Sequence, residues 1–465
     1  MILVISRITG FASKASPAPV WPRNSSVRRF ILMFAASPEP ELRTRLSRIE
    51  PYLNAIAVFI MATFFLFWDV SRAVYVLFSL AALGFIVKYR PRMPAEHRLY
   101  SWPIIAYVAA ICLSLVVHGL PDSGVNRIGS RYLLLLIAIP LAPVFYLSYD
   151  PRRNTWIKFA ACSVVMGCLA LVDVLILHEY RAGGGFNPAG FGFIALVSTS
   201  LVVAAYHRFK QTGFGMAIFI AAILMGVCAM ILSGTRSSWL AAIAVFFIAM
   251  FFYLDRYSIS RRILVSLVVL CCIAVVSSSI PIVQKRIDHM IEVVTPYVRG
   301  EDQTEYNSLR DRVELWKLGW KMGMDHKAFG YGPGYTKKKI REYAVRYPEF
   351  AGIATMNHIH NQFLQTFAMT GLVGLISLLV MIACHFWIFA KYLRKCYSAE
   401  VRSLALGGFL LLVTYVIYSI PAIPFGGKHN LMMYGFASAT IWGCLLGALR
   451  ESEKDSQEET RVRNP

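Results

Sequence analysis

Charged residues are scarce in this chain. Asp, Glu, Lys and Arg together make up 16% of its 465 residues, against about 25% in an ordinary soluble domain. Apolar residues make up 57%, and the mean hydropathy is +0.54. A chain this apolar cannot bury its surface in a water-soluble core, and it is too hydrophobic to remain disordered. The composition excludes a soluble globular protein and predicts an integral membrane protein.

Acidic residues are the scarcer of the two charged classes. The chain has 26 Asp and Glu against 47 Lys and Arg, which gives a formal net charge of +21. In a soluble protein this excess would indicate nucleic acid binding. In a membrane protein it is explained by Lys and Arg retained in cytoplasmic loops, where they fix the orientation. We therefore expect no nucleic acid partner.

Patterns typical of metal and disulfide chemistry are missing. The nine cysteines form no Cys-x-x-Cys pair and no Cys/His zinc spacing, so we expect neither a disulfide framework nor a structural metal. The apolar stretch at the N-terminus, Met1 to Ile5, is too short for the hydrophobic region of a signal peptide. Met33 is an alternative start of the chain.

Long apolar stretches, by contrast, recur along most of the sequence. A membrane-spanning helix needs about 20 mostly apolar residues, and twelve stretches come close to this criterion. They cover residues 51–68, 73–87, 101–118, 132–148, 159–178, 187–206, 214–232, 239–254, 263–282, 361–390, 403–420 and 431–449. The sequence thus predicts an all-α integral membrane protein with about twelve transmembrane helices.

Lys and Arg are distributed unevenly between the two sides of this predicted bundle. The short loops on the side of the termini carry far more of them than the short loops on the other side. The positive-inside rule therefore places both termini in the cytoplasm. The even number of spans agrees with this regular alternation.

One predicted loop is much longer than the others. Residues 283–358 lie on the external side between spans nine and ten, and a loop of this length is usually functional. Apolar residues from Leu309 to Trp320 follow one another at helical spacing, which predicts amphipathic helices within it. The expected parts are a partly disordered cytoplasmic segment 1–50, spans one to nine at 51–282, the external loop 283–358, spans ten to twelve at 359–449, and a cytoplasmic tail 450–465.

Several arginines lie on the external side, against the orientation bias. They include Arg131, Arg181, Arg236, Arg310 and Arg312. A single external arginine is commonly explained by pairing with a lipid headgroup or a loop acid. As a set they predict a basic pocket at the outer face, because the planar guanidinium group binds phosphate through two parallel hydrogen bonds.

Two of these arginines adjoin predicted helix starts. Arg236 lies in a turn just before span eight, and Arg181 precedes three glycines and the N-cap candidate Asn187, which is followed by Pro188. The free N–H groups at a helix start attract anions. Both turns are therefore candidate anion sites, although residues 183–188 are also explained as a well-formed start of a helix.

A glycine-rich segment, residues 329–335, looks like a phosphate loop but has the wrong setting. It lacks the spacing of a nucleotide-binding loop, and no predicted strand precedes it. We expect a tight loop that shapes the pocket. The basic run at 337–341 is most simply a solvated helix face, with an acidic partner or lipid phosphates as the alternative.

Two histidines, His358 and His360, end the long loop. On a helix, residues two apart diverge by about 200°, so only one of them could face a given site. No carboxylate cluster joins them in the external loops, and we expect no metal there. A histidine beside a basic pocket is a natural general base at neutral pH, and His360 is our candidate.

Asp173 lies within predicted span five. An acid inside a membrane helix is costly and is functional by default. A hydrogen bond across the bundle is the alternative, and the sequence names no partner for it.

The order of these motifs resembles that of the O-antigen ligase/polymerase family of bacterial inner-membrane glycosyltransferases. The family's ligases show His-[Asn/Ser/Gln], nine residues, and Gly-x-x-[Gly/Thr/Tyr]. Here His360 and Asn361 are followed by nine residues and the segment Gly371–Gly374. The segments Ser233–Trp239 and Arg312–Trp316 also resemble family patterns. The resemblance spans roughly residues 50–450, with specific motifs between 183 and 374.

The resemblance implies a GT-C-like fold and a defined reaction. Such ligases move O-antigen from undecaprenyl pyrophosphate onto a sugar hydroxyl of lipid A-core at the periplasmic face, with no cofactor or metal. The family's histidine corresponds to His360 and its essential arginines to Arg236 and Arg312. The remaining candidates for binding pyrophosphate or glycan are Arg310, Arg181, Asn187, Asn361 and Arg131. Whether Arg310 or Arg312 points inward stays open, and we expect a monomer or a weak oligomer among membrane lipids.

Three alternatives remain. An O-antigen or exopolysaccharide polymerase would use the same donor, but the His360 motif favours a ligase. A protein O-oligosaccharyltransferase usually has a sizeable periplasmic domain after its last span, whereas only the short polar segment 450–465 follows here. A lipid-linked glycan transporter commonly shows internal repeats and deep charges, and the sequence offers only Asp173.

Overall fold

The structure is a computed structural model. It describes residues 51–60, 68–119, 125–151, 153–185, 187–255, 257–278, 308–394 and 396–463, with a few more positions between 284 and 295. The chain divides into two units, Met1–Arg45 and Leu46–Pro465. The predicted segment 1–50 and most of residues 279–307 lie outside the described residues, so the structure concerns the second unit alone.

Every regular element among the described residues is a helix, as the sequence predicts. After the helix Pro51–Ile60, they are α4 (Trp68–Tyr89), α5 (His97–His118), α6 (Val125–Leu136), α7 (Leu141–Leu147), α8 (Ile157–Leu171), η1 (Val172–Ile176), α9 (Pro188–Ala204), α10 (Tyr206–Phe209), α11 (Gly213–Ser233), α12 (Arg236–Tyr253), α13 (Ile259–Ser278), α15 (Ser308–Asp325), α16 (Thr336–Arg346), η2 (Pro348–Ile353), α17 (Gln362–Lys391), α18 (Ala399–Tyr418) and α19 (Lys428–Arg463). Each predicted apolar stretch contains helix in its described part, and the stretch 132–148 contains two helices separated by a turn.

Eight helices in the described part of the chain are long and apolar enough to cross a membrane. They cover Asp69–Tyr89, His97–His118, Ile157–Ile176, Gly213–Ser233, Arg236–Tyr253, Gln362–Lys391, Ala399–Tyr418 and Lys428–Lys454. Three shorter apolar helices are Pro51–Ile60, Arg131–Leu147 and Pro188–Ala204. The chain is a multi-pass membrane protein, and the count of twelve crossings stays a prediction.

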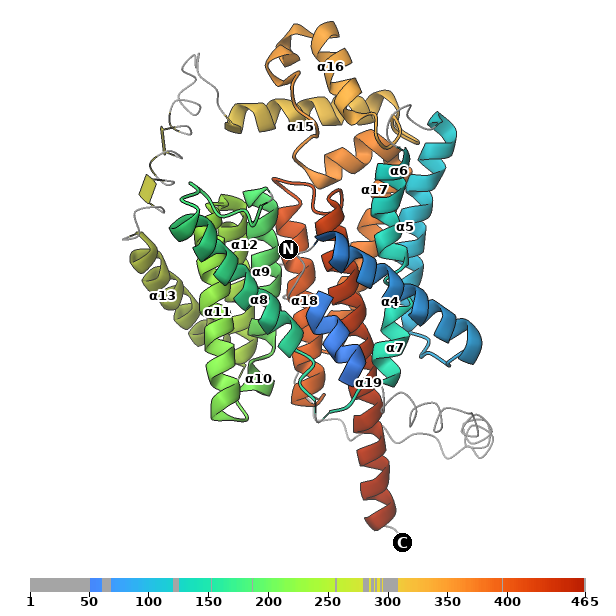
Figure 1. Ribbon diagram of the computed structural model, residues 1–465, viewed down its shortest axis with the longest axis vertical. Coiled ribbons are helices and arrows are strands. Elements are labelled where there is room, and N and C mark those ends of the chain that lie inside the picture. Colours follow the sequence, from blue (N-terminus) through green and yellow to red (C-terminus); the bar gives the residue numbers. More distant parts are fainter. Residues whose placement is uncertain are drawn as a thin grey trace. The chain divides into compact units, whose positions relative to one another are not determined.

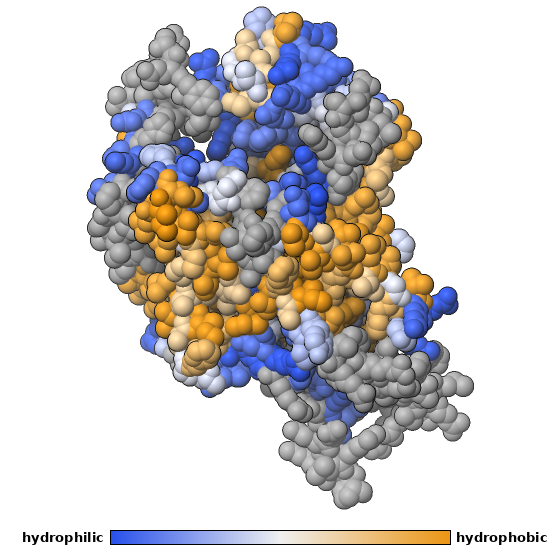
Figure 2. All heavy atoms as spheres, in the orientation of Figure 1, coloured by the Kyte–Doolittle hydropathy of each residue, from blue (hydrophilic) through white to orange (hydrophobic). Residues whose placement is uncertain are grey.

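The surface of the helices agrees with this assignment. Figure 2 shows apolar residues gathered in a band over the helices, with hydrophilic residues toward both ends. Large apolar side chains are exposed on them, including Val116 at 80% and Trp387 at 68%. Such exposure is costly in water and costs nothing against lipid tails. The fourth predicted stretch, 132–148, is divided into α6 and α7 just before Pro140, which cannot donate a helical hydrogen bond.

The described part of the long loop, residues 308–358, forms a cap that rests on the start of α17. Figure 1 shows α15 and α16 beyond the end of the membrane-length helices, and α15 packs against α17. The cap has its own apolar core, which includes Leu315, Leu318 and Ile340. Side chains at Gly319 and Gly323 would collide with Ile359 and Phe367. These two glycines therefore let α15 approach the segment around His360 closely.

Candidate functional site

His360 lies in the turn between η2 and α17, in a strained backbone conformation. Its φ is +53°, a region that a residue other than glycine adopts rarely and only where its surroundings hold it. The Trp316 indole donates a hydrogen bond to the His360 carbonyl at 3.2 Å. The preceding Ile359 N–H donates to the side chain of Gln365 at 2.8 Å. Contacts from α15 and α17 thus fix this turn.

Asn361 begins α17 as its N-cap. Its side-chain oxygen accepts a hydrogen bond from the Leu364 N–H at 3.0 Å. The next residue, Gln362, donates its N–H to the Ser419 carbonyl at 2.8 Å, and its side chain accepts from the Phe425 N–H at 2.9 Å. The Asn361 amide oxygen therefore serves the helix start, and a substrate contact of Asn361 stays a prediction.

The electrostatics of His360 favour a neutral imidazole. Burial, and after it the charges of His358 and Arg312, lower the pKa of His360 from 6.5 to about 4. The rings of His358 and His360 have their centroids 4.0 Å apart. Within the described part of the chain, no hydrogen bond occupies the ring nitrogens of His360. At neutral pH the ring therefore carries a lone pair that can accept a proton.

The two arginines of α15 lie on different faces of the helix. The Arg310 Nε atom is 2.9 Å from a Glu314 carboxylate oxygen, and the Arg310 side chain is 55% exposed. Arg312 is half-buried, and its charge acts on the imidazole of His360. It shares its face with Trp316, four residues later, which bonds to the His360 backbone. Arg312 therefore faces His360, and Arg310 lies on the face of Glu314.

Asp173 holds the glycine turn that follows η1. One of its carboxylate oxygens accepts hydrogen bonds from the Gly183 N–H at 2.8 Å and the Gly184 N–H at 2.6 Å. Gly184 and Gly185 have φ of +55° and +75°, which residues with a Cβ adopt at a cost. The partner of Asp173 that the sequence did not reveal is therefore a backbone turn. An acid bound to a turn ten residues later is invisible to helical periodicity.

Arg181 stands next to this turn and is anchored to the next one. Its Nε donates to the Ser233 carbonyl at 2.8 Å, and a terminal nitrogen donates to the Thr235 hydroxyl at 3.4 Å. The Thr235 hydroxyl in turn donates to the Pro188 carbonyl at 3.0 Å. The loop that contains Arg181 and the turn before Arg236 therefore form one connected unit.

Arg236 is the first residue of α12 and is half-buried. Gly234, with φ of +59°, ends α11, and the Thr235 side chain makes no cap bond to α12. The Ser238 N–H donates to the Thr235 carbonyl at 3.0 Å. The Thr235 side chain leaves the earlier N–H groups of α12 uncapped, which is the arrangement expected of an anion-binding helix start.

Tyr418, at the end of α18, is the residue that sequence analysis missed. It is 3% exposed, and its hydroxyl donates to the Ala189 carbonyl at 2.7 Å. The charges of Arg312 and Arg181 both act on its phenol, and the Ser237 side chain interacts with the same hydroxyl. A tyrosine near the end of an apolar stretch is common at membrane interfaces, so nothing in the sequence distinguished this one. The next residue, Ser419, accepts the Gln362 N–H, so Tyr418 lies beside the His360 turn as well as beside the loop of Arg181.

Two predicted site residues make other contacts, although Asn187 adjoins the Pro188 and Ala189 carbonyls that Thr235 and Tyr418 contact. Asn187 is exposed and caps α9, as predicted, by accepting from the Ala189 N–H at 2.8 Å. Arg131 donates to the Gly426 carbonyl at 3.5 Å. Among the contacts of the described residues, none joins either of them to His360 or Arg312.

The glycine loop docks on a break in α17. Gly371 has φ of +64° inside that helix. The Gly332 N–H donates to the Met369 carbonyl at 2.9 Å, and the Leu372 N–H donates to the Lys327 carbonyl at 2.7 Å. A Cβ at Gly330 or Gly371 would collide with the backbone of the other segment. The segment Gly371–Gly374, the second half of the histidine motif, therefore provides the surface on which the loop between α15 and α16 packs.

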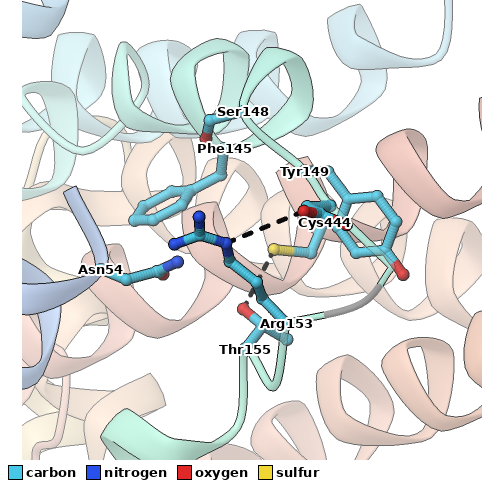
Figure 3. A pocket seen from close by; sticks show the side chains of 8 residues that line it. Asn54, Phe145, Ser148, Tyr149, Arg153, Thr155 and Cys444 are labelled. Carbon is cyan, nitrogen blue, oxygen red and sulfur yellow. Dashed lines mark hydrogen bonds and ion pairs between the residues drawn. The ribbon is translucent and has the colours of Figure 1, made fainter. Parts of the chain in front are cut away.

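A small cavity lies at the other end of α8 from Arg181. Figure 3 shows its lining side chains, and the lining residues are Asn54, Phe145, Ser148, Tyr149, Asp150, Arg153, Thr155 and Cys444. Thr155 contacts the Cys444 sulfur at 3.3 Å, and the buried Lys158 donates to Thr155 at 3.2 Å. The helical segment from Ile157 to Ile176, which is about 30 Å long, lies between this cavity and the loop of Arg181. It is therefore no part of the candidate site.

Comparisons with known proteins agree with the motifs. A family model described as O-antigen ligase matches residues 220–379, a segment that contains Arg236, Arg312 and His360. A protein of Haemophilus influenzae, whose function is uncharacterised, is 24% identical over 351 residues, which are 73% of this chain and 85% of that protein. The resemblance inferred from the sequence is thereby confirmed for residues 220–379, the segment of this multi-pass membrane chain that matches the O-antigen ligase family model.

Proposed function

We propose that this protein transfers an O-antigen glycan from undecaprenyl pyrophosphate to a sugar hydroxyl of lipid A-core, at the periplasmic face of the bacterial inner membrane. One arrangement carries the proposal. His360, just before α17, is held against α15 by Trp316, and the charge of Arg312 acts on its ring. Tyr418 and Ser419 bond to Ala189, beside the loop of Arg181, and to Gln362, beside the His360 turn. A neutral base beside several guanidinium groups suits transfer from a lipid pyrophosphate.

The arginines act on the leaving group. As the bond between the glycan C1 and the pyrophosphate oxygen breaks, negative charge develops on the pyrophosphate. Fixed cations aimed at that charge stabilise the transition state. Arg236 and Arg312 are the two groups that we assign to this task, and the uncapped first turn of α12 adds N–H dipoles beside Arg236.

His360 acts on the acceptor. Its neutral ring takes the proton of the lipid A-core hydroxyl while that oxygen attacks C1 from the side opposite the pyrophosphate. A single displacement of this kind inverts the anomeric centre. A pKa of about 4 makes the free imidazole a weak base. The negative pyrophosphate raises this pKa when the donor binds, because nearby negative charge favours the imidazolium ion.

Both substrates are anchored in the membrane. The site should therefore open sideways to the lipid as well as to the periplasm, and its outward orientation follows from the positive-inside rule. We expect no cofactor and no metal. In the test reaction EDTA should leave the rate unchanged, and inhibition that added metal reverses would contradict this expectation.

The test uses the purified full chain in detergent with undecaprenyl-pyrophosphate-linked O-antigen and lipid A-core. A ladder above the lipid A-core band on a gel, absent in the His360→Ala variant, is the expected result. Longer carrier-linked glycan from the donor alone would indicate the polymerase alternative. No conversion without a sealed membrane would contradict an enzyme and favour a transporter.

A further inference from the structure

The cationic groups of the site come from two separate segments of the chain, the cap and the loop before α9. Arg312 belongs to the cap, on α15, whereas Arg181 belongs to the loop before α9 and is anchored to Ser233 and Thr235. Guanidinium groups repel one another when no anion lies between them. The distance between the Arg312 and Arg181 guanidinium groups therefore depends on the polar groups or anions near them.

Tyr418 is tied by hydrogen bonds to both segments. Its hydroxyl bonds to Ala189, next to the Pro188 carbonyl that Thr235 contacts, and its neighbour Ser419 accepts the Gln362 N–H at 2.8 Å beside the His360 turn. Tyr418 comes from α18, and the charges of both Arg312 and Arg181 act on its phenol. The Tyr418 hydroxyl proton is committed to the Ala189 carbonyl at 2.7 Å. The lone pairs of the same oxygen are therefore not used by this bond, and Ser237, Arg181 and Arg312 are the polar groups that act on the phenol. A neutral acceptor in this place offsets part of the repulsion between the guanidinium groups.

The Tyr418 ring is held as firmly as its hydroxyl. It stacks on Phe193 of α9 with the ring centroids 4.2 Å apart and the planes tilted by 28°. The side chain is 3% exposed, so packing leaves it one position. A rigid ring with a fixed hydroxyl can define a distance between two charged groups, which a flexible polar side chain cannot do.

We propose that Tyr418 is a positioning residue that joins the cap arginine and the loop arginine into one site for a lipid diphosphate. The inference rests on the proposed function and deepens it. With Arg312 on one side and Arg181 on the other, the site can offer a guanidinium group to each of two linked phosphates. Tyr418 thereby determines how strongly the site prefers a diphosphate to a monophosphate.

The test is equilibrium binding of undecaprenyl pyrophosphate and of undecaprenyl phosphate to the purified full chain in detergent. Wild type should prefer the pyrophosphate. Tyr418→Phe should weaken binding of the pyrophosphate about tenfold, the effect of one lost hydrogen bond in a charged site. Its affinity for the monophosphate should change less than about twofold. A merely structural role would weaken both lipids equally.

Tyr415→Phe is the matched control. Tyr415 lies one turn earlier on α18, is also buried, and also packs on Phe193. Its hydroxyl likewise donates to a backbone carbonyl, that of Asn430, at 2.5 Å. This variant loses the same kind of buried hydrogen bond outside the arginine site, so its lipid preference should equal that of wild type.

Four results would overturn the inference. Equal loss for both lipids in Tyr418→Phe, or binding like wild type, contradicts it while leaving the proposed function intact. Wild type that binds no undecaprenyl pyrophosphate contradicts both. If Tyr418→Phe does not fold, Ser237→Ala removes the other partner of the phenol and should shift the preference in the same direction, by about threefold. An unchanged preference in Ser237→Ala is the fourth contrary result.

Discussion

At the scale of single residues, the two arginines of α15 offer a matched comparison. Arg312 faces His360, whereas Arg310 pairs with Glu314 and is 55% exposed. Loss of one charge aimed at the developing negative charge of a transition state lowers kcat about 100-fold or more. We expect that loss for Arg312→Ala, whereas an exposed ion pair contributes little. Arg310→Ala should stay within about threefold of wild type.

The measurement is the initial rate of lipid A-core modification at saturating donor, with the amount of folded protein matched by gel filtration. Similar losses of kcat in the Arg310→Ala and Arg312→Ala variants would contradict the conclusion that only Arg312 faces the site. Full activity of Arg312→Ala would remove its catalytic role.

The pH dependence of the reaction follows from His360. Its pKa is lowered to about 4, so the neutral base persists well below pH 6.5, and protonation removes the lone pair only as the pH falls toward 4. We therefore expect kcat/KM, which reports the free enzyme, to show no loss between pH 8 and about pH 5.5 that depends on His360. Comparison of wild type with His358→Ala checks the assignment, because loss of the neighbouring ring should move the acid limb toward higher pH. An acid limb centred near pH 6.5 in wild type would contradict the low pKa.

At the scale of elements, the break in α17 carries a stability prediction. Gly371 has φ of +64°, and a Cβ there would collide with the backbone of Ala328. Gly371→Ala should therefore lower the free energy of unfolding by about 2 kcal/mol or more, from backbone strain and displacement of the glycine loop. Thermal unfolding in detergent measures it. Gly84→Ala, where nothing lies within 4 Å of the added Cβ, is the control and should be neutral or slightly stabilising. Equal melting temperatures of the two variants would contradict this role for Gly371.

Patterns within a short stretch of sequence predict the helices and their caps well. They do not predict contacts between segments that are far apart in the chain. Asn187 was recognised as an N-cap because Pro188 follows it, and α15 because its apolar residues recur at helical spacing. The docking of Gly332 on Met369 joins residues 37 positions apart through their backbones, so no side-chain pattern marks it. Tyr418 is missed for the same reason, since only the fold brings it and Ser419 to the loop of Arg181 and to the His360 turn.

At the scale of the whole molecule, hydropathy predicted the helices, whereas orientation depends on charge alone. The positive-inside rule places α16 outside and the connection between α17 and α18 inside. Lys338 on α16 is exposed, and so is the natural Cys396 in that connection. These two positions lie on opposite sides only if α17 crosses the membrane once, as its length of 30 residues allows.

Labelling with a membrane-impermeant maleimide tests this arrangement in spheroplasts. In a chain whose other cysteines are replaced by alanine, Lys338→Cys should be labelled from outside, whereas Cys396 should react only after the membrane is permeabilised. The thiol at position 338 is the positive control for the reagent, and Cys396 is the control for membrane integrity. The reverse pattern would place His360 and Arg312 in the cytoplasm and would contradict transfer to lipid A-core at the periplasmic face. Labelling of both positions from outside would instead show that α17 does not cross, because a single crossing must separate residues that precede and follow it.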